Sequence, residues 1–123
     1  MLTPILATDD PYEAASSFVA AGWSSVFQTP PESGDPLTCV ELAGAQVMLG
    51  TSLPAFLPPE SRDHKGAGVE FHVTVPASTI QSVYEAHKQH AESTTELALR
   101  PWGELAFHAV LAGYRFLIAA EGA

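Results

Sequence analysis

The sequence predicts an α+β fold in which one βαβββ unit occurs twice, the two units forming a curved mixed sheet around a cleft. Each half of the 123-residue chain reads as a strand, a helix and three further strands. Residues 111–118 echo residues 42–49, since both segments begin with Leu-Ala-Gly and continue as an apolar strand. Between the halves lies a segment rich in proline and glycine. We therefore expect a single domain, 1–123, with a first module at 1–51, a linker at 52–68 and a second module at 69–121.

In the first half, a helix signal follows a short apolar strand. Asp10 is placed to cap the helix, Pro11 suits its first position and Glu13 completes a capping-box pattern. Phe18 recurs at helical spacing and Gly22 ends the helix. The expected strands of this half are 3–7, 23–29, 37–42 and 45–49.

In the second half, residues 69–75 alternate strictly between apolar and polar side chains, which predicts a strand with one buried and one free face. One face of the following helix carries Ile80, Val83, Tyr84 and His87. His64, His87 and His90 are nevertheless expected at the surface, in a loop or on this helix. The remaining strands are expected at 94–99, 105–110 and 114–119. Two half-sheets with a free face each would enclose the cleft.

Composition narrows the classes of function. With 46% hydrophobic and 15% charged residues the chain is expected to be globular. Its formal charge of −9 opposes binding to nucleic acid and favours cationic small molecules, although it also serves solubility. No apolar run approaches the length of a membrane span, so no membrane partner is expected. The single cysteine, Cys39, leaves no internal disulfide and suits the cytoplasm.

A doubled βαβββ unit of this size resembles the vicinal-oxygen-chelate superfamily of glyoxalases, bleomycin-resistance proteins and extradiol dioxygenases. The resemblance covers nearly the whole chain and is carried by residues 4–10, 18–23, 69–75 and above all Pro101-Trp102-Gly103-Glu104. The closest likeness is to the bleomycin-resistance proteins, which bind a drug and are not catalytic. One departure is the turn before the last strand, where relatives usually carry Asp-Pro-x-Gly-Asn. Here the turn is Val110-Leu111-Ala112-Gly113-Tyr114 and keeps only the glycine.

The resemblance also implies where a metal would be held. It maps the ligand positions of the enzymes onto Thr3, Met48, Glu70 and Leu117. A thioether and an isobutyl group are poor ligands for a hard divalent ion, so neither a metal nor a cofactor is expected. An alternative trio is Glu70, His72 and His108, which could hold zinc or iron if their strands are adjacent. Otherwise His72 and His108 are neutral histidines of the pocket wall or the core.

Two functions follow from these residues. The first is a non-catalytic protein that binds an antibiotic-like, cationic and aromatic small molecule and confers resistance by sequestration. Trp102 would be its stacking floor unless it only packs against a neighbouring loop. Its other candidate contacts are the second wall, Phe27 or Phe56, the charge partners Glu70 and Glu104, the apolar floor at Met48, and the histidines His72 and His108.

The second function is a metal-dependent lyase, isomerase or dioxygenase of the same fold, which would use Glu70, His72 and His108. Elemental analysis of the purified protein separates the two. For the assembly we expect a homodimer, because two half-sheets in one short chain leave strand edges and a cleft open. Pro4 could fix an extended arm that crosses to the partner, or it could simply start an edge strand.

Overall fold

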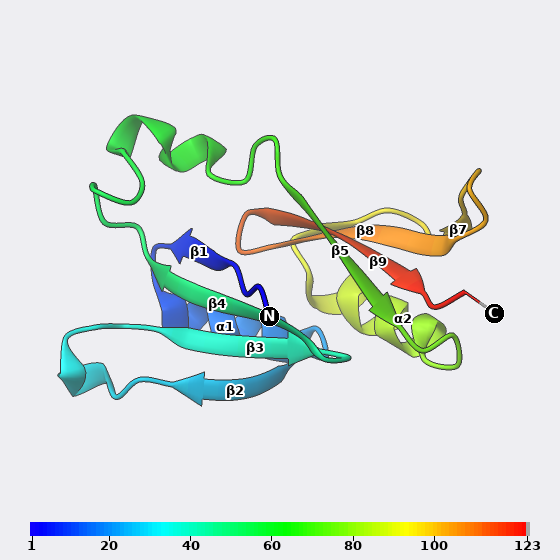
Figure 1. Ribbon diagram of the computed structural model, residues 1–123, viewed down its shortest axis with the longest axis horizontal. Helices are drawn as coiled ribbons and strands as arrows, with labels where there is room; N and C mark the ends of the chain where they lie inside the picture. The colour runs from blue at the N-terminus through cyan, green and yellow to red at the C-terminus, as the bar shows by residue number, and fades with distance from the viewer. Residues whose placement is uncertain (123) are drawn as a thin grey trace.

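The computed structural model describes residues 1–122 and contains the same element order twice (Figure 1). The first set is β1 (Ile5–Thr8), α1 (Pro11–Ala20), β2 (Ser24–Gln28), β3 (Thr38–Leu42) and β4 (Ala45–Thr51). The second set is β5 (Glu70–Val75), α2 (Ile80–His90), β6 (Ser93–Thr94), β7 (Ala98–Leu99), β8 (Leu105–Leu111) and β9 (Tyr114–Ala120). Two short 3₁₀ helices, η1 (Pro31–Ser33) and η2 (Pro59–His64), lie in the connections. The predicted α+β fold is confirmed.

One expected strand, 94–99, is divided into β6 and β7. In the segment between them, Leu97 is half-buried and packs against the hydrophobic core. The two short strands still pair with β8, at Thr94–Ala109 and at Ala98–Ala106.

The two modules have the same strand pairing. The first sheet has the order β1-β4-β3-β2 and the second the order β5-β9-β8-β6, with β7 also on β8. In each sheet the first strand runs parallel to the last, and the other pairs are antiparallel. Met48 stands opposite Ile5, and Leu117 stands opposite His72. The repeat in the sequence therefore corresponds to a repeat in topology.

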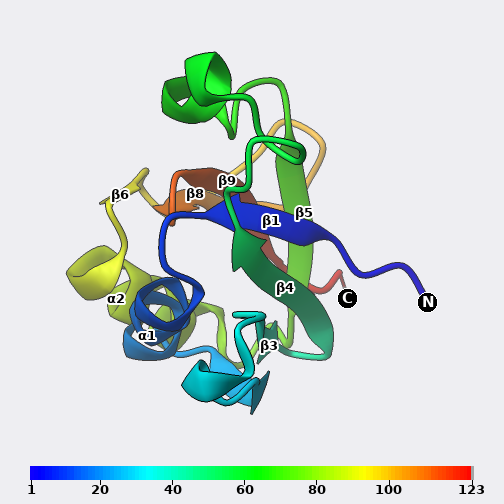
Figure 2. The same ribbon diagram turned by 90° about the vertical axis from the view of Figure 1, so that its left-hand side faces the viewer.

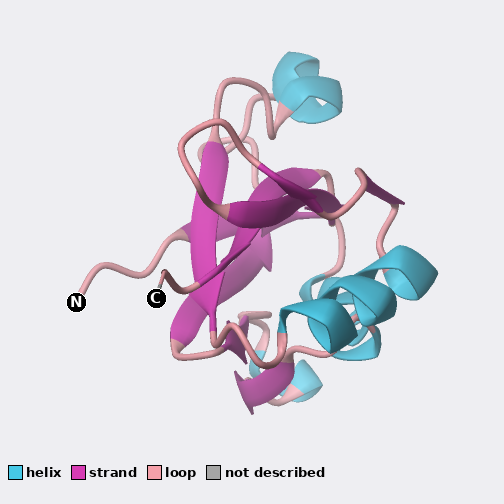
Figure 3. Ribbon diagram, turned by 90° about the vertical axis from the view of Figure 1, so that its right-hand side faces the viewer, coloured by secondary structure: helices cyan, strands magenta, loops and turns pink. Residues whose placement is uncertain are grey.

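The helices α1 and α2 lie next to each other on one side of the molecule (Figure 3). The α1 helix begins where the sequence predicts, because the Asp10 carboxylate accepts the backbone N–H groups of Tyr12 and Glu13 at 3.0 and 3.3 Å. Gly22 follows the helix with a φ of +107°, a conformation that favours glycine. Within residues 1–122, neither helix has the length and apolar character needed to cross a membrane.

The core joins the two modules through aromatic side chains. Phe18 and Trp23 come from the first module, and their ring centroids lie 5.7 and 5.4 Å from that of Phe116 in the second. Phe18 also meets Trp23 edge to face at 5.0 Å. Such contacts add to the gain from burying apolar surface, so the modules share one core.

His87 was expected at the surface, and that prediction is wrong. Its side chain is 0% exposed, and its Nε2 accepts the indole N–H of Trp23 at 2.9 Å. The other ring nitrogen, Nδ1, donates to the Val83 carbonyl oxygen at 2.8 Å, so the imidazole is neutral with its proton on Nδ1. Burial lowers the pKa of His87, while the Val83 hydrogen bond opposes that shift. The partner that makes burial possible lies 64 residues away and in the other module.

The two hairpins of the repeat have matching turns. Ala43 and Gly44 have φ values of +51° and +88°, and Ala112 and Gly113 have +52° and +83°. Positive φ at both central residues is the mark of a type I′ turn, which fits the twist of the flanking strands. The large ring of Tyr114, which follows the second turn, is buried, and its hydroxyl donates to the Ala7 carbonyl oxygen at 2.8 Å.

Candidate ligand-binding face

One face of the second sheet packs against the core, and the other is open. Alternation along β5, β8 and β9 places Glu70, His72, His108, Arg115 and Leu117 on the open side, which we call the free face. Register aligns His72, Leu117 and His108 in one row across the three strands. The order β5-β9-β8 thus brings side chains from distant parts of the sequence onto one surface.

Glu70 is the centre of the first polar cluster on this face. Its Oε1 accepts from His108 Nε2 at 2.8 Å and from Arg115 Nε at 2.9 Å. On the far side of the ring, Arg100 Nη2 donates to His108 Nδ1 at 3.2 Å. Because a guanidinium only donates, Nδ1 has a lone pair and the proton of His108 is on Nε2. His108 is therefore a neutral link between Arg100 and Glu70.

The electrostatics agree with that tautomer. Desolvation is the main cause that lowers the pKa of His108, followed by the charge of Arg115. Glu70 raises this pKa and Arg100 lowers it further, and the net shift is downward. Both ring nitrogens are engaged, so His108 has no lone pair left to accept a proton from a substrate.

Trp102 and Glu104 form the second cluster. The indole N–H of Trp102 donates to Glu104 Oε1 at 3.0 Å, and His72 Nε2 approaches Glu104 Oε2 at 2.9 Å. The hydrogen bond from Trp102 is the main cause that lowers the pKa of Glu104, followed by the hydrogen bond and charge of His72, while desolvation opposes them. Gly103, with a φ of +94°, makes the tight turn that places the indole beside this carboxylate.

The Trp102 ring is 63% exposed and lies at a cavity of about 430 Å³. The walls of this cavity include the apolar side chains of Ala77, Leu105 and Ala120. Small-molecule sites commonly combine such apolar walls with a few fixed polar groups. The indole therefore has a free ring face next to a concave surface.

The other candidate contacts lie elsewhere. Phe27 is on β2, the outer strand of the first sheet, and Met48 is on β4 of the same sheet. Phe56, 52% exposed in the linker, lines a separate cavity of about 260 Å³ with Ile5 and Tyr114. Alternation along a strand predicts a shared face within one sheet, but it does not predict which residues of two different sheets line the same cavity.

The alternative metal trio does not come together. Glu70 is bonded to His108, but His72 is turned to Glu104. Across residues 1–122, no three His, Cys, Asp or Glu side chains are grouped so that they could hold a metal ion. At the positions that the resemblance implies, Met48 and Leu117 offer no hard donor.

The sequence did not point to two arginines of this site, Arg115 on the free face and Arg100 bonded to His108. Arg115 could have been found, because it alternates with Phe116 on a predicted strand and shares the parity of Leu117. Arg100 had no such signal, since its side chain reaches His108 from the loop after β7.

No protein-family model matches this sequence, and no curated protein is similar to it in sequence. Solved structures do match. A member of the glyoxalase/bleomycin resistance protein/dioxygenase superfamily from Sphaerobacter thermophilus is 19% identical with a TM-score of 0.66, over 97% of this chain and 94% of that one. A bleomycin-binding protein complexed with bleomycin is 13% identical with a TM-score of 0.66, over 99% and 98% of the two chains. An antibiotic binding protein from Streptomyces sp. is 12% identical with a TM-score of 0.69, over 98% and 93%.

At these identities the likeness establishes the fold. The chain has the glyoxalase/bleomycin-resistance-like fold of two βαβββ modules, and the resemblance noted in the sequence is confirmed at that level.

Proposed function

We propose that the protein binds an antibiotic-like aromatic small molecule without chemical change and protects the cell by sequestering it. The observation that carries the proposal is Trp102, a large exposed ring held in place by Glu104 beside an apolar cavity. Because its N–H is already bonded to Glu104 while the ring is exposed, the indole is suited to stacking on a flat ligand. The antibiotic-binding proteins that share the fold support the same class of function.

A positive charge on the ligand would add to this binding. The electron-rich face of an indole attracts a cation, and the Glu104 carboxylate on the indole N–H adds negative charge nearby. Glu70 and Glu104 are already bonded to Arg115, His108, His72 and Trp102, so neither is an unpaired counter-ion. We therefore propose that the ring face of Trp102, and not a free carboxylate, is the main contact for a cationic aromatic group.

Replacement of Trp102 tests the proposal. Stacking contributes about 1 kcal/mol beyond area burial and a desolvated cation–π contact about 2 kcal/mol. Trp102→Ala should therefore weaken binding of 9-aminoacridine, a flat cation, or of bleomycin by roughly tenfold to a hundredfold in calorimetric titration. Val19→Ala removes an exposed apolar side chain on α1, outside the lining of this cavity, and is the control. Equal affinity in Trp102→Ala and the wild type would refute the stacking role.

We also propose that two copies associate in the cytoplasm, where the single buried thiol of Cys39 would stay reduced. The first residues extend away from the body of the molecule (Figure 2), and Met1 and Leu2 are fully exposed. Ile5, Val26 and Phe27 of the same module are exposed as well. A second copy that covers these side chains would remove apolar surface from water.

Sedimentation measures this association directly. At micromolar concentration the wild type should sediment with a mass near two chains, and Phe27→Ser should shift the equilibrium toward one chain. A wild-type mass near one chain would contradict the dimer.

A further inference from the structure

The free face differs in charge from the rest of the molecule. Arg115 lies on this face and Arg100 reaches it through His108. Their two positive charges balance the negative charges of Glu70 on the face and of Glu104, which is bonded to His72. The remaining 12 acidic and 3 basic residues thus carry the whole formal charge of −9. Two of the five basic residues of the chain therefore lie beside the neutral His108.

Around His108 the positive charges exceed the negative ones. Glu70 is the one carboxylate bonded to His108 and Arg115, since Glu104 is engaged by Trp102 and His72. Arg100 forms no ion pair within residues 1–122 and donates instead to the neutral ring of His108. Among the groups bonded together around His108, two guanidinium groups and one carboxylate leave one excess positive charge.

The Arg100 guanidinium is also poorly compensated by hydrogen bonds. Its Nε is buried and has no acceptor among the described residues. A buried donor without a partner is costly, and a charged group suffers most. An anion nearby would stabilise this charge even without touching Nε.

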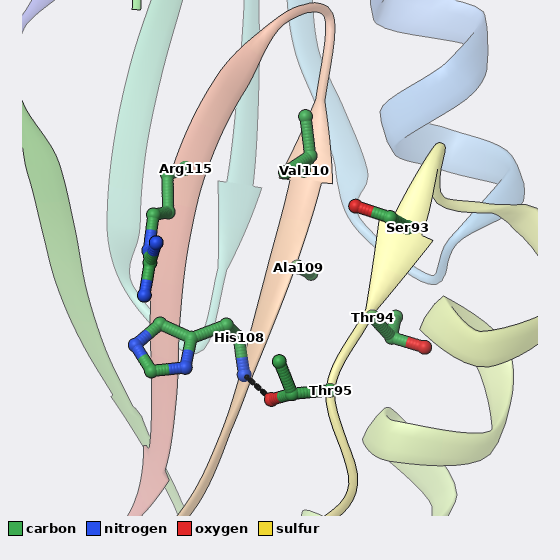
Figure 4. Close-up of a pocket in the computed structure, with 7 residues that line it drawn as sticks. All are labelled: Ser93, Thr94, Thr95, His108, Ala109, Val110 and Arg115. Atoms are coloured by element: carbon green, nitrogen blue, oxygen red, sulfur yellow. Dashed lines mark hydrogen bonds between the residues drawn. The ribbon is translucent and has the colours of Figure 1, made fainter. Parts of the chain in front are cut away.

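A small cavity of about 130 Å³ adjoins the excess charge (Figure 4). Arg115 and His108 lie on one side of it, and Ser93 and Thr95 lie on the other. The Thr95 Oγ accepts the backbone N–H of His108 at 2.8 Å, which leaves its own hydroxyl hydrogen free to donate. Within residues 1–122, the Arg115 guanidinium is bonded only through Nε, to Glu70, so its two terminal nitrogens are available.

We propose that this cavity binds an acidic group of the ligand, a carboxylate or another oxyanion of one negative charge and similar size. Arg115 and the hydroxyls of Ser93 and Thr95 donate to it, and Arg100 contributes its charge from behind His108. The inference rests on the proposed function, because it names a second group on the molecule that stacks on Trp102. The ligand is then amphoteric, with an aromatic cation at Trp102 and an acid at the His108 cavity.

Benzoate and benzamide test the cavity without using Trp102. The two probes have nearly the same shape, but only benzoate is charged at pH 7. In ¹H–¹⁵N spectra of the full chain, benzoate should shift the His108 ring and Arg115 Nε signals in a saturable way, and benzamide should not. Equal shifts from both probes, or none from either, would overturn the proposal.

Substitution of single basic residues tests which positive charge binds benzoate. Arg115→Gln and Arg100→Gln should each weaken benzoate binding by about tenfold, the effect of losing one hydrogen-bonded or nearby charge. Lys88→Gln, at an exposed position on α2, removes the same charge from a side chain that does not line the cavity and should leave the affinity unchanged. A loss with Lys88→Gln as large as with Arg115→Gln would mean that only net charge matters, and would overturn the site. The number of dispersed amide signals shows whether each variant is folded.

The outcomes separate this inference from the proposed function. If 9-aminoacridine binds through Trp102 but benzoate fails, the acid site is wrong and the stacking role stands. If benzoate binds and Trp102→Ala does not change 9-aminoacridine affinity, the stacking role is wrong and the acid site stands. If neither probe binds, both proposals fail.

Discussion

The two sheets carry equivalent rows of side chains with different chemistry. Across the first sheet, register joins Ile5, Met48, Cys39 and Phe27. Across the second, it joins His72, Leu117 and His108. In the first row the ionisable group is the Cys39 thiol, whose pKa is raised by burial and then by the charge of Glu41. In the second row, His72 is bonded to Glu104, and His108 is bonded to Glu70 and Arg100. The two modules therefore share a backbone topology but differ in the chemistry of the side chains at equivalent positions.

Under the two proposals above, the first module serves association and the second serves ligand binding. An apolar row with exposed Ile5 and Phe27 is suited to contact with another protein surface. A row of paired charges beside an exposed indole is suited to a small molecule with both aromatic and polar groups. The comparison predicts that substitutions at equivalent positions have unequal consequences, and the largest inequality lies in the core.

Phe116 and Val47 occupy equivalent positions, one residue before Leu117 and Met48, and both are buried. Phe116 contacts rings of the first module, Phe18 and Trp23, so it holds the two modules together. Phe116→Ala should lower the free energy of unfolding by about 3–5 kcal/mol, and Val47→Ala by about 2 kcal/mol. Urea unfolding monitored by tryptophan fluorescence measures both. Equal losses would mean that the shared core does not depend on Phe116.

The helices differ in the same way at their eighth residue, which is Phe18 in α1 and His87 in α2. Both side chains are 0% exposed and both pack on Trp23. The unfolded chain binds a proton at His87 below about pH 6.5, but the folded state resists it because its pKa is lowered. This contribution to stability is therefore fully present above about pH 6.5 and is lost as the pH falls below that value.

His87→Gln tests the contribution, because Gln does not titrate and its side-chain oxygen can still accept the Trp23 N–H. The free energy of unfolding should depend less on pH between about 7 and 5 in this variant than in the wild type. His90→Gln, exposed on the same helix, is the control. The same flattening in both variants would show that burial of His87 is not the cause.

Much of this comparison could be predicted from the sequence. Alternation in residues 69–75, the capping signal at Asp10 and the echo of residues 42–49 in 111–118 gave the fold and its repeat, because each depends on local preference or period. Strand parity also predicted that Glu70 and His72 share a face.

The rest depended on contacts between distant segments. Glu70 meets His108 because β9 lies between β5 and β8, and no local pattern specifies that order. His87 is buried because a tryptophan of the other module supplies its hydrogen-bond donor. For Phe27, aromatic character suggested a pocket wall, but its strand is at the outer edge of the other sheet.

The smallest predicted effect concerns the two turns. Ala43 and Ala112 adopt nearly the same positive φ, +51° and +52°, which costs an L-residue with a Cβ roughly 1–2 kcal/mol. Asparagine tolerates this conformation better and is favoured at the first position of a type I′ turn. Ala43 is exposed, so Ala43→Asn should raise the free energy of unfolding by up to about 1 kcal/mol. Ala112 is half-buried and packs against the core, so Ala112→Asn gains the same relief but must desolvate an amide. The second substitution should therefore stabilise less than the first in urea unfolding. A larger gain at Ala112 would mean that its packing against the core is unfavourable and that the two turns differ in strain and not in burial.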